Sequence, residues 1–184
     1  MSARREILLG VGGGIAAYKV AALASRLVQA GCSVRVAMTP RALEFVSALT
    51  FEGLTGRKAI LSPTQIDVDG SVPHIAAAAT AHAYAIAPAT ADLIGRLAAG
   101  LADDPVCLLA LTCRCPILLC PAMNDAMWLN PVVQRNVEQL TARGMRLCGP
   151  VVGHLAEGYD AIGRMAEPET IAAAILGIAA PGPS

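Results

Sequence analysis

A glycine turn between an apolar strand and an amphipathic helix constrains the fold of this chain most strongly. Residues Glu6–Val11 form an apolar run that leads into three glycines starting at Gly12. Ala17–Ala30 then repeats apolar side chains at the spacing of one helical face, and Gly31 ends this segment. Ser33–Met38 follows as a second strand-like segment. Strand, tight turn, helix and strand predict a βαβ unit, which requires a parallel sheet.

Later apolar runs extend this unit along the chain. Tyr84–Ala87 and Ile117–Cys120 predict buried central strands, each of which stops at a proline. Further predicted elements are a helix over Val132–Arg143, a strand over Met145–Cys148 and a closing helix over Pro168–Ala179. We therefore expect a single Rossmann-like (flavodoxin-like) α/β domain with a doubly wound parallel sheet over residues 1–180, and a frayed tail at 181–184. Ligands of such sheets bind at the carboxyl ends of the strands.

Composition adds an expectation about assembly. Hydrophobic residues make up 55% of the chain and charged residues only 15%, against typical values of about 45–50% and 25%. A domain with so few charges is expected to bury surface against copies of itself, as a homo-oligomer. The formal net charge is zero, and without a cluster of basic residues we expect no nucleic-acid partner.

The sequence favours a cytoplasmic chain without membrane contact. The apolar segment Val106–Cys120 contains Arg114 and Pro116, and it is shorter than the roughly 20 residues that span a bilayer. The basic start of the chain is not followed by the apolar core of a signal peptide. The six cysteines are then expected to be reduced, buried thiols, and their spacing predicts no metal site.

The glycine turn has the form of a phosphate-binding motif. Residues 12–17 fit G-x-G-x-x-[GA] between a strand and a helix, where backbone amides favour an anion. A dinucleotide site would also need an acidic residue about 20 residues further on. The second strand ends instead at Thr39, whose hydroxyl suits a terminal phosphate, so the sequence favours FMN over NAD. The alternative, that the glycines serve only close helix–strand packing, stays open.

Three later stretches carry side chains for chemistry. Small residues from Pro88 to Asp92 follow one buried strand and leave room for a flat ring. The segment from Pro121 to Trp128 follows the next strand and carries an amide, Asn124, which needs polar partners. The glycine-rich segment Gly153–Met165 predicts a flexible loop that carries Glu157 and Arg164.

On these residues the chain resembles the homo-oligomeric flavin-containing cysteine decarboxylases. The motifs that carry the resemblance are GGGIAAYK at 12–19, VPHI at 72–75, APATAD at 87–92, PAMNDAMW at 121–128 and the GRM ending of the glycine-rich loop. The resemblance implies an FMN site formed by Gly13, Gly14, Ile15, Thr39, Arg41, Thr90, Ala91, Asp92 and Ala122. It also implies trimers, often assembled into dodecamers, with FMN between subunits.

The same resemblance implies roles for the residues of a substrate site. His74 is implied as the catalytic base, because its intrinsic pKa near 6.5 suits transfer of a thiol proton at neutral pH. Asn124 is implied as the ligand of the substrate carboxylate, and Met127, Glu157 and Arg164 complete the substrate site. The implied chemistry is transfer of hydride to FMN, followed by loss of CO₂ to leave an enethiolate. His82 and His154 lie outside the motifs, and we expect them to be structural or surface residues.

The residue at position 157 distinguishes the two substrate classes of this family. The phosphopantothenoylcysteine (PPC) decarboxylases of this family have a cysteine at the corresponding place, which supports reduction of the enethiolate, whereas peptide-modifying members lack it. We therefore predict an FMN-dependent decarboxylase of the C-terminal cysteine of a ribosomal precursor peptide, which yields an aminoenethiol for an S-aminovinyl-cysteine type ring. One alternative is a PPC decarboxylase of coenzyme A biosynthesis in which Glu157 donates the proton. A flavin-binding regulatory subunit is a further alternative.

Overall fold

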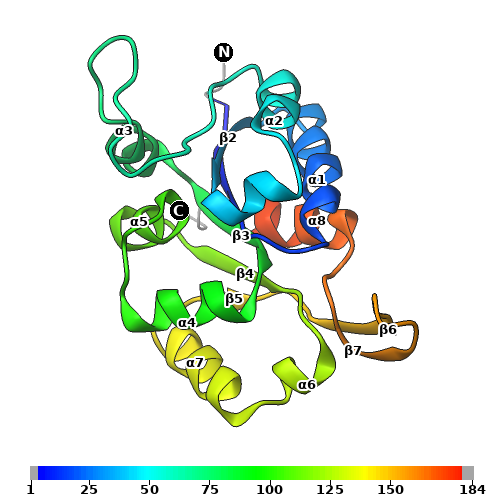
Figure 1. Ribbon diagram of the computed structural model, residues 1–184. Coiled ribbons are helices and arrows are strands. Elements are labelled where there is room, and N and C mark those ends of the chain that lie inside the picture. Colours follow the sequence, from blue (N-terminus) through cyan, green and yellow to red (C-terminus); the bar gives the residue numbers. More distant parts are fainter. Residues whose placement is uncertain (1–3, 180–184) are drawn as a thin grey trace.

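A five-stranded parallel sheet forms the centre of the computed structural model, which describes residues 4–179 (Figure 1). Its strands are β1 (Glu6–Val11), β2 (Ser33–Met38), β3 (Ala83–Ala89), β4 (Ile117–Pro121) and β5 (Arg146–Leu147). They lie in the order β2-β1-β3-β4-β5, and each neighbouring pair is parallel. This order confirms the predicted flavodoxin-like fold, in which the ligand crevice opens between the ends of β1 and β3. The predicted tail at 181–184 lies outside the described residues.

Helices cover both faces of the sheet. They are α1 (Ala17–Gln29), the 3₁₀-helix η1 (Pro40–Glu44), α2 (Ala48–Thr55), α3 (Pro73–Thr80), α4 (Ala91–Ala99), α5 (Pro105–Thr112), α6 (Asp125–Trp128), α7 (Pro131–Ala142) and α8 (Pro168–Ile178). Helices α1, α2 and α8 share one hydrophobic core with one face of the sheet. Helices α3, α4, α5 and α7 share a second core with the opposite face (Figure 1).

The first βαβ unit folds as its apolar pattern predicts. On β1, Ile7 and Leu9 belong to the core under α1, while Leu8 between them belongs to the core on the opposite face. On α1, Leu23 and Leu27 lie one turn apart, and both are fully buried. Burial of each such leucine side chain contributes about 1.5–3 kcal/mol. The unit is therefore anchored on both faces of the sheet.

Two predicted strand ends are wrong. Strand β3 continues through Pro88 to Ala89, and β4 includes Pro121. The register of β3 on β4 shifts between Ile86 and Ala89, and such an irregularity lets a strand accommodate a residue that has no N–H to donate. Both strands thus carry their chains further toward the crevice than the prolines suggested.

The glycine-rich segment is a hairpin, which corrects the prediction of a flexible loop over Gly153–Met165. Strands β6 (Val151–His154) and β7 (Asp160–Arg164) pair antiparallel in a separate sheet, and the hairpin projects beside α6 (Figure 1). The Leu155 N–H donates to the Tyr159 carbonyl at 2.9 Å and closes the turn. Gly158 has a φ of +92°, a left-handed conformation that favours glycine. The glycines therefore shape a defined turn.

The two edges of the main sheet are short. Strand β5 has only two residues, and both Arg146 and Leu147 are exposed. At the opposite edge, Ile60 forms a single parallel bridge with Ala37 of β2. The apolar segment 106–120 is divided between α5 and β4. Among residues 4–179, no helix has the length and apolarity to cross a membrane.

Candidate functional site

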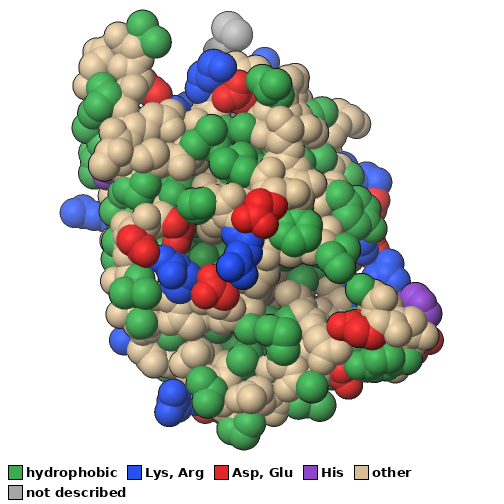
Figure 2. All heavy atoms as spheres, viewed as in Figure 1, with side chains coloured by type: hydrophobic (Ala, Val, Ile, Leu, Met, Phe, Trp, Pro, Cys, Tyr) green, Lys and Arg blue, Asp and Glu red, His purple; other side chains and the backbone are tan. Residues whose placement is uncertain are grey.

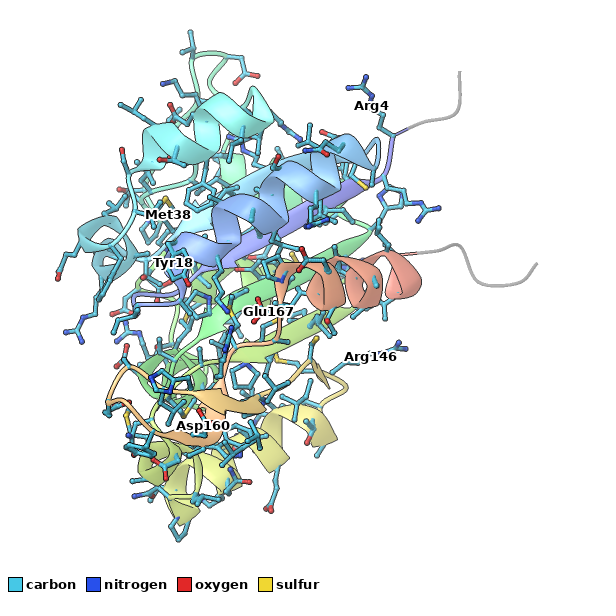
Figure 3. All side chains as sticks on the ribbon, turned by 90° about the vertical axis from the view of Figure 1, so that its right-hand side faces the viewer. Arg4, Tyr18, Met38, Arg146, Asp160 and Glu167 are labelled. Carbon is cyan, nitrogen blue, oxygen red and sulfur yellow. The ribbon has the colours of Figure 1, made fainter. Side chains whose placement is uncertain are left out.

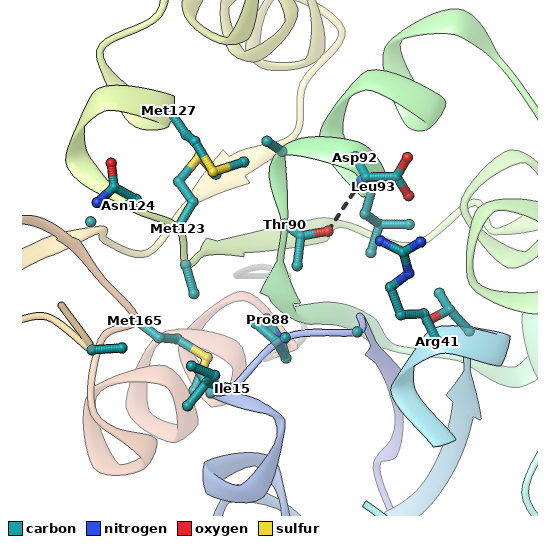
Figure 4. A pocket seen from close by; sticks show the side chains of 18 of the residues that line it. Ile15, Arg41, Pro88, Thr90, Asp92, Leu93, Met123, Asn124, Met127 and Met165 are labelled. Carbon is teal, nitrogen blue, oxygen red and sulfur yellow. Dashed lines mark hydrogen bonds between the residues drawn. The ribbon is translucent and has the colours of Figure 1, made fainter. Parts of the chain in front are cut away.

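A cavity of about 900 Å³ opens at the carboxyl ends of the strands. Its walls come from the segments that follow β1, β2, β3 and β4, together with the β6–β7 hairpin. Figure 4 shows Arg41 and Asp92 on one side of this cavity and Asn124 on the other. We call the first side the cofactor end and the second the hairpin end. The sheet thus places the cavity where a doubly wound fold is expected to bind ligands.

Close backbone approach shapes the cofactor end. A Cβ atom on Gly12 would lie 2.2 Å from the carbonyl oxygen of Pro88, and one on Gly13 would lie 2.4 Å from Cγ of Arg41. Both distances are shorter than any contact that real side chains make. Glycine at these positions lets the turn after β1 approach both the end of β3 and η1. The alternative that these glycines serve only close packing is therefore correct in part, because they pack closely and Gly13 and Gly14 also line the cavity.

Two helices direct their N-termini into the cofactor end. Helix α1 begins beside Gly14, and α4 begins after Thr90, whose Oγ1 accepts from the Leu93 N–H at 3.3 Å (Figure 4). Thr39 caps η1 in the same manner, through a hydrogen bond of 3.1 Å from the Ala42 N–H. Each threonine hydroxyl still has a hydrogen to donate. Helix N-termini and the guanidinium of Arg41 favour an anionic group here.

The cofactor end fits a flavin mononucleotide. The residues predicted for FMN all line the cavity: Gly13, Gly14, Ile15, Thr39, Arg41, Thr90, Ala91, Asp92 and Ala122. The donors just described suit a phosphate, and the small side chains leave room for a flat ring. Asp92 adds a carboxylate on the side where the Arg41 guanidinium lies (Figure 4).

Asn124 is the centre of the hairpin end. Its Oδ1 accepts from the Ala126 N–H at 2.9 Å and so caps α6. The amide nitrogen therefore faces the hairpin, where Nδ2 donates to Oε1 of Glu157 at 3.0 Å and to the Tyr159 hydroxyl at 3.0 Å. The structure brings together Asn124 and Glu157, two residues predicted for the substrate site that are 33 positions apart.

Tyr159 is a residue of this end that the sequence analysis missed. Its hydroxyl donates to Oδ1 of Asp125 at 2.6 Å. This hydrogen bond and the nearby carboxylates raise the pKa of Tyr159, although the bond from Asn124 lowers it. No local pattern marked Tyr159, because residues 155–159 form a turn in which the alternation of an extended strand does not hold.

The base of the hairpin is joined to the segment before α6 by backbone contacts. The Met123 N–H donates to the Gly163 carbonyl at 3.0 Å. Gly163 has a φ of +142°, and a Cβ there would lie 2.1 Å from the Met123 carbonyl oxygen. Met127, another predicted substrate residue, lines the cavity and is 47% exposed. The hairpin is thus attached by backbone at its base and by side chains at its tip.

Glu167 joins the hairpin to the first helix. Arg164 of β7 donates to Oε1 of Glu167 at 2.7 Å, and Lys19 of α1 donates to the same oxygen at 3.0 Å. Figure 3 shows Glu167 between α1 and the hairpin. The hydrogen bond from Lys19 lowers the pKa of the Glu167 carboxyl, and the charges of Lys19 and Arg164 add to this effect. Arg164 lines the cavity, as predicted, but its guanidinium is engaged by this carboxylate.

His74 lies apart from the other predicted site residues. It sits on α3, and the cavity walls do not include it within residues 4–179. Its Nδ1 is buried without a hydrogen-bond partner in the described part of the chain. His154 is exposed on β6 at the cavity and pairs with Asp160, while exposed His82 accepts from the Glu6 N–H. A single chain therefore does not bring His74 to Asn124.

The hairpin tip carries the Glu157 carboxylate at the position where the resemblance implies a cysteine in PPC decarboxylases. In the described residues, the cysteine that precedes the hairpin most closely is Cys148, which is buried. A hydrogen bond from Cys120 lowers the pKa of Cys148 to about 7, and burial opposes this shift. Half-buried Cys113 and Cys115 depart from the expectation that the cysteines are buried. The groups at the tip that can carry a proton are thus Glu157 and Tyr159.

Comparison with known proteins adds two kinds of relatives. The family model described as Flavoprotein matches residues 1–180. The coenzyme A biosynthesis bifunctional protein CoaBC of Mycolicibacterium smegmatis is 45% identical over 171 residues, which cover 93% of this chain and 41% of that protein. CoaBC of Bacillus subtilis is 44% identical over 167 residues, or 91% of this chain and 41% of that protein. The chain thus spans about two fifths of the length of these curated relatives.

Solved structures share the fold over nearly the whole chain. A mutant PPC decarboxylase in complex with pantothenoylaminoethenethiol superposes with a TM-score of 0.84 at 28% identity, over 95% of this chain and 97% of that one. The FMN-dependent cysteine decarboxylase TvaF from thioviridamide biosynthesis superposes with a TM-score of 0.81 at 28% identity, over 97% of this chain and all of that one.

The predicted peptide substrate is wrong on this comparison. Curated relatives at 43–45% identity are coenzyme A biosynthesis proteins, and the PPC decarboxylase structure superposes with a TM-score of 0.84 against 0.81 for the thioviridamide enzyme. The prediction rested on Glu157 in place of a cysteine. Glu157 is one exposed side chain at the tip of a turn, and a single exposed position does not determine what the rest of the cavity binds.

Proposed function

The chain belongs to the Flavoprotein family and its cofactor is FMN, and we propose that it decarboxylates the cysteine moiety of PPC in coenzyme A biosynthesis. The observation that carries the proposal is the 45% identity to a coenzyme A biosynthesis protein over 93% of this chain. The position of the Asn124 amide at the cavity supports it. The proposal concerns this decarboxylation alone, because the chain matches only part of those relatives.

The hairpin end supplies a neutral site for the substrate carboxylate. When bound here, FMN would supply a reversible acceptor for the hydride that leaves the carbon bearing sulfur. The Nδ2 group of Asn124 orients the carboxylate by hydrogen bonds. Because the amide carries no positive charge, it stabilises the departing carboxylate less than a cation would. Asn124 thus positions the group that leaves as CO₂ without holding it back.

Two residues are proposed to transfer protons. The imidazole of His74 takes the thiol proton of the substrate as the sulfur-bearing carbon is oxidised. Glu157 donates a proton to the carbon that has lost CO₂, in the role of the thiol that this chain lacks. The net reaction consumes one proton and releases CO₂ and a saturated thiol, so it needs no external oxidant or reductant.

The proton-donor role is tested with Glu157→Gln in the FMN-loaded protein given PPC. We expect the wild type to release a product lighter by CO₂ alone, and the variant to accumulate a product that has also lost two hydrogens, with bleached flavin absorbance. Glu138→Gln, at an exposed position on α7, is the matched control. Wild-type protein that binds PPC without turnover would contradict the proposal and favour a binding role.

We further propose that the protein works as a homo-oligomer in which α3 of one copy reaches the cavity of another. Three observations support this: His74 lies outside the cavity of its own chain, the loop before α3 projects from the body (Figure 1), and Ile66, Val68 and Ile75 are 62%, 110% and 51% exposed. On the face in Figure 2, hydrophobic side chains spread between scattered charged groups. We propose a trimer, with a dodecamer as its assembled form.

Co-expression of two inactive variants tests the shared site. His74→Asn removes the base, and Asn124→Asp keeps an acceptor for the α6 cap while it repels a substrate carboxylate. If each site takes His74 and Asn124 from different copies, random mixing restores activity at about a quarter of the sites. Each variant alone is expected to be inactive. No recovery in mixed oligomers would place both residues of a site on one chain and contradict the shared site.

A further inference from the structure

The hydrogen bonds of Asn124 leave its amide with no free donor. A primary amide has two N–H groups and one oxygen. The oxygen is used by the Ala126 N–H at 2.9 Å, and the two N–H groups are used by Glu157 and Tyr159, each at 3.0 Å. A carboxylate of a ligand can therefore bind this amide only if one of the two hairpin residues leaves it.

Glu157 is the one that can leave more easily. The Tyr159 hydroxyl is held a second time, by its hydrogen bond of 2.6 Å to Asp125. Within residues 4–179, the amide is the only side-chain partner of the Glu157 carboxylate, and the nearest cation along β7, Arg164, is paired with Glu167. An arriving carboxylate also repels the Glu157 carboxylate. Glu157 can thus move away while Tyr159 keeps the hairpin joined to Asp125, with the tip held less tightly than before.

We infer that Glu157 and the substrate carboxylate exchange on the Asn124 amide during turnover. This inference rests on the proposed decarboxylation and assigns Glu157 a second role, that of an internal competitor for the carboxylate site. The substrate displaces Glu157 on binding, and the side chain can return only after CO₂ has left. Once displaced, the exposed Glu157 carboxylate takes up from water the proton that the net reaction consumes. It then returns as the neutral acid next to the carbon that needs a proton, after the step that must precede protonation. The exchange thus makes loss of CO₂ precede protonation of the carbon.

Two unreactive ligands that differ by one carboxylate provide the test. Phosphopantothenoylserine keeps the carboxylate but has no thiol to oxidise, and phosphopantothenoylethanolamine lacks the carboxylate. Their binding to FMN-loaded protein is followed by the change in flavin absorbance. For Glu157→Ala we expect the first ligand to bind about threefold to tenfold more tightly, because it no longer competes with one solvent-exposed hydrogen bond. The second ligand is expected to bind as in the wild type.

Matched variants separate competition from a general change of the hairpin. Glu157→Gln keeps an acceptor for Asn124 without the charge, so we expect a smaller gain for the serine ligand. Tyr159→Phe frees one N–H group but releases the hairpin tip from Asp125, so it should not favour the serine ligand selectively. Equal gains for both ligands in Glu157→Ala, or no gain for the serine ligand, would overturn the exchange.

Hydrogen exchange in the ligand-free protein tests, without any substrate, whether Glu157 holds the hairpin tip on Asn124. If Glu157 holds the tip on Asn124, backbone amides at 155–159 should exchange faster in Glu157→Ala than in the wild type. Unchanged exchange overturns the inference. If exchange is faster but neither ligand binds the wild type, the proposed decarboxylation fails while the contact of Glu157 with Asn124 stands.

Discussion

The two ends of the cavity are built in different ways. The cofactor end is formed by backbone: two helix N-termini and a glycine turn in contact with Pro88 and Arg41. The hairpin end is formed by side chains, namely Asn124, Asp125, Glu157 and Tyr159, which are bonded to one another at the tip of a hairpin. Backbone contacts of this kind admit one geometry, whereas side-chain hydrogen bonds can be exchanged. The difference suits a fixed cofactor and a substrate that must enter and leave.

The largest effect should come from placing a side-chain atom in the close backbone contact at the cofactor end. In Gly12→Ala, the new Cβ would lie 2.2 Å from the Pro88 carbonyl oxygen, and neither backbone can move without disturbing the sheet. We expect a loss of about 3 kcal/mol or more in the free energy of unfolding, together with loss of FMN, as measured by denaturation and flavin absorbance. Gly53→Ala has open space in α2 and should stabilise the protein by about 0.5–1 kcal/mol. A Gly12→Ala protein that retains FMN would contradict this account.

The second-largest effect should come from disturbing the backbone contact at the base of the hairpin. Gly163→Ala places a Cβ 2.1 Å from the Met123 carbonyl oxygen at a φ of +142°. We expect a cost of about 2–3 kcal/mol and a fall of about tenfold or more in kcat/KM, because the hairpin can no longer meet Asn124. The protein should still bind FMN, which its absorbance would show. Gly158→Ala at the tip, with a φ of +92° and no neighbour, should cost only about 1 kcal/mol. If Gly163→Ala loses FMN, the two ends are not independent.

Loss of one hydroxyl at the tip should have a smaller effect. Tyr159→Phe removes the bonds to Asp125 and Asn124 but leaves the hairpin backbone intact. We expect KM to rise by about threefold to tenfold, since each lost bond is worth about 0.5–1.5 kcal/mol, with no change in FMN content. Steady-state kinetics and flavin absorbance measure the two quantities. A change in FMN content with KM unaffected would contradict the assignment of Tyr159 to the hairpin end.

The link between the two ends should give the smallest effect, visible as pH dependence. Lys19 lowers the pKa of Glu167 below its ordinary value of 4.5. Stability from this carboxylate is therefore present above pH 4.5 and is lost as the pH falls through the lowered pKa. Because Glu167 is half exposed, we expect less than about 1 kcal/mol. Urea midpoints from pH 3 to pH 7 should decline less steeply at the acid end in Glu167→Gln than in the wild type. Parallel curves would show that the link adds no stability.

The sequence predicted the cofactor end better than the hairpin end. The bounds of β1 and β2 match the structure at Glu6–Val11 and Ser33–Met38, because a buried parallel strand, a glycine turn and an amphipathic helix follow one another in the chain. The nine residues predicted for the cofactor all line the cavity. The resemblance to the flavin-containing cysteine decarboxylases supplied these nine residues, whereas the apolar period and the glycine turn predicted the strands and the helix beside them.

The hairpin end was harder to predict, because it is formed by contacts between residues far apart in the sequence, which a local pattern does not show. The bond from Asn124 to Glu157 joins residues 33 positions apart, and glycines in the hairpin were taken for flexibility when Gly163 serves a close contact. Helix α5 also went unpredicted, because it is apolar on most sides and shows no helical period.

The short edges of the main sheet restrict how copies of this protein can meet. An exposed strand edge is a template for a further strand, and it is the usual route to unwanted aggregation. Here one edge ends in a strand of two residues, and the other is partly covered by the chain at Ile60. Neither edge offers a long row of free amides and carbonyls to a neighbour. The proposed homo-oligomer is therefore expected to form through surfaces other than the two edges of the main sheet.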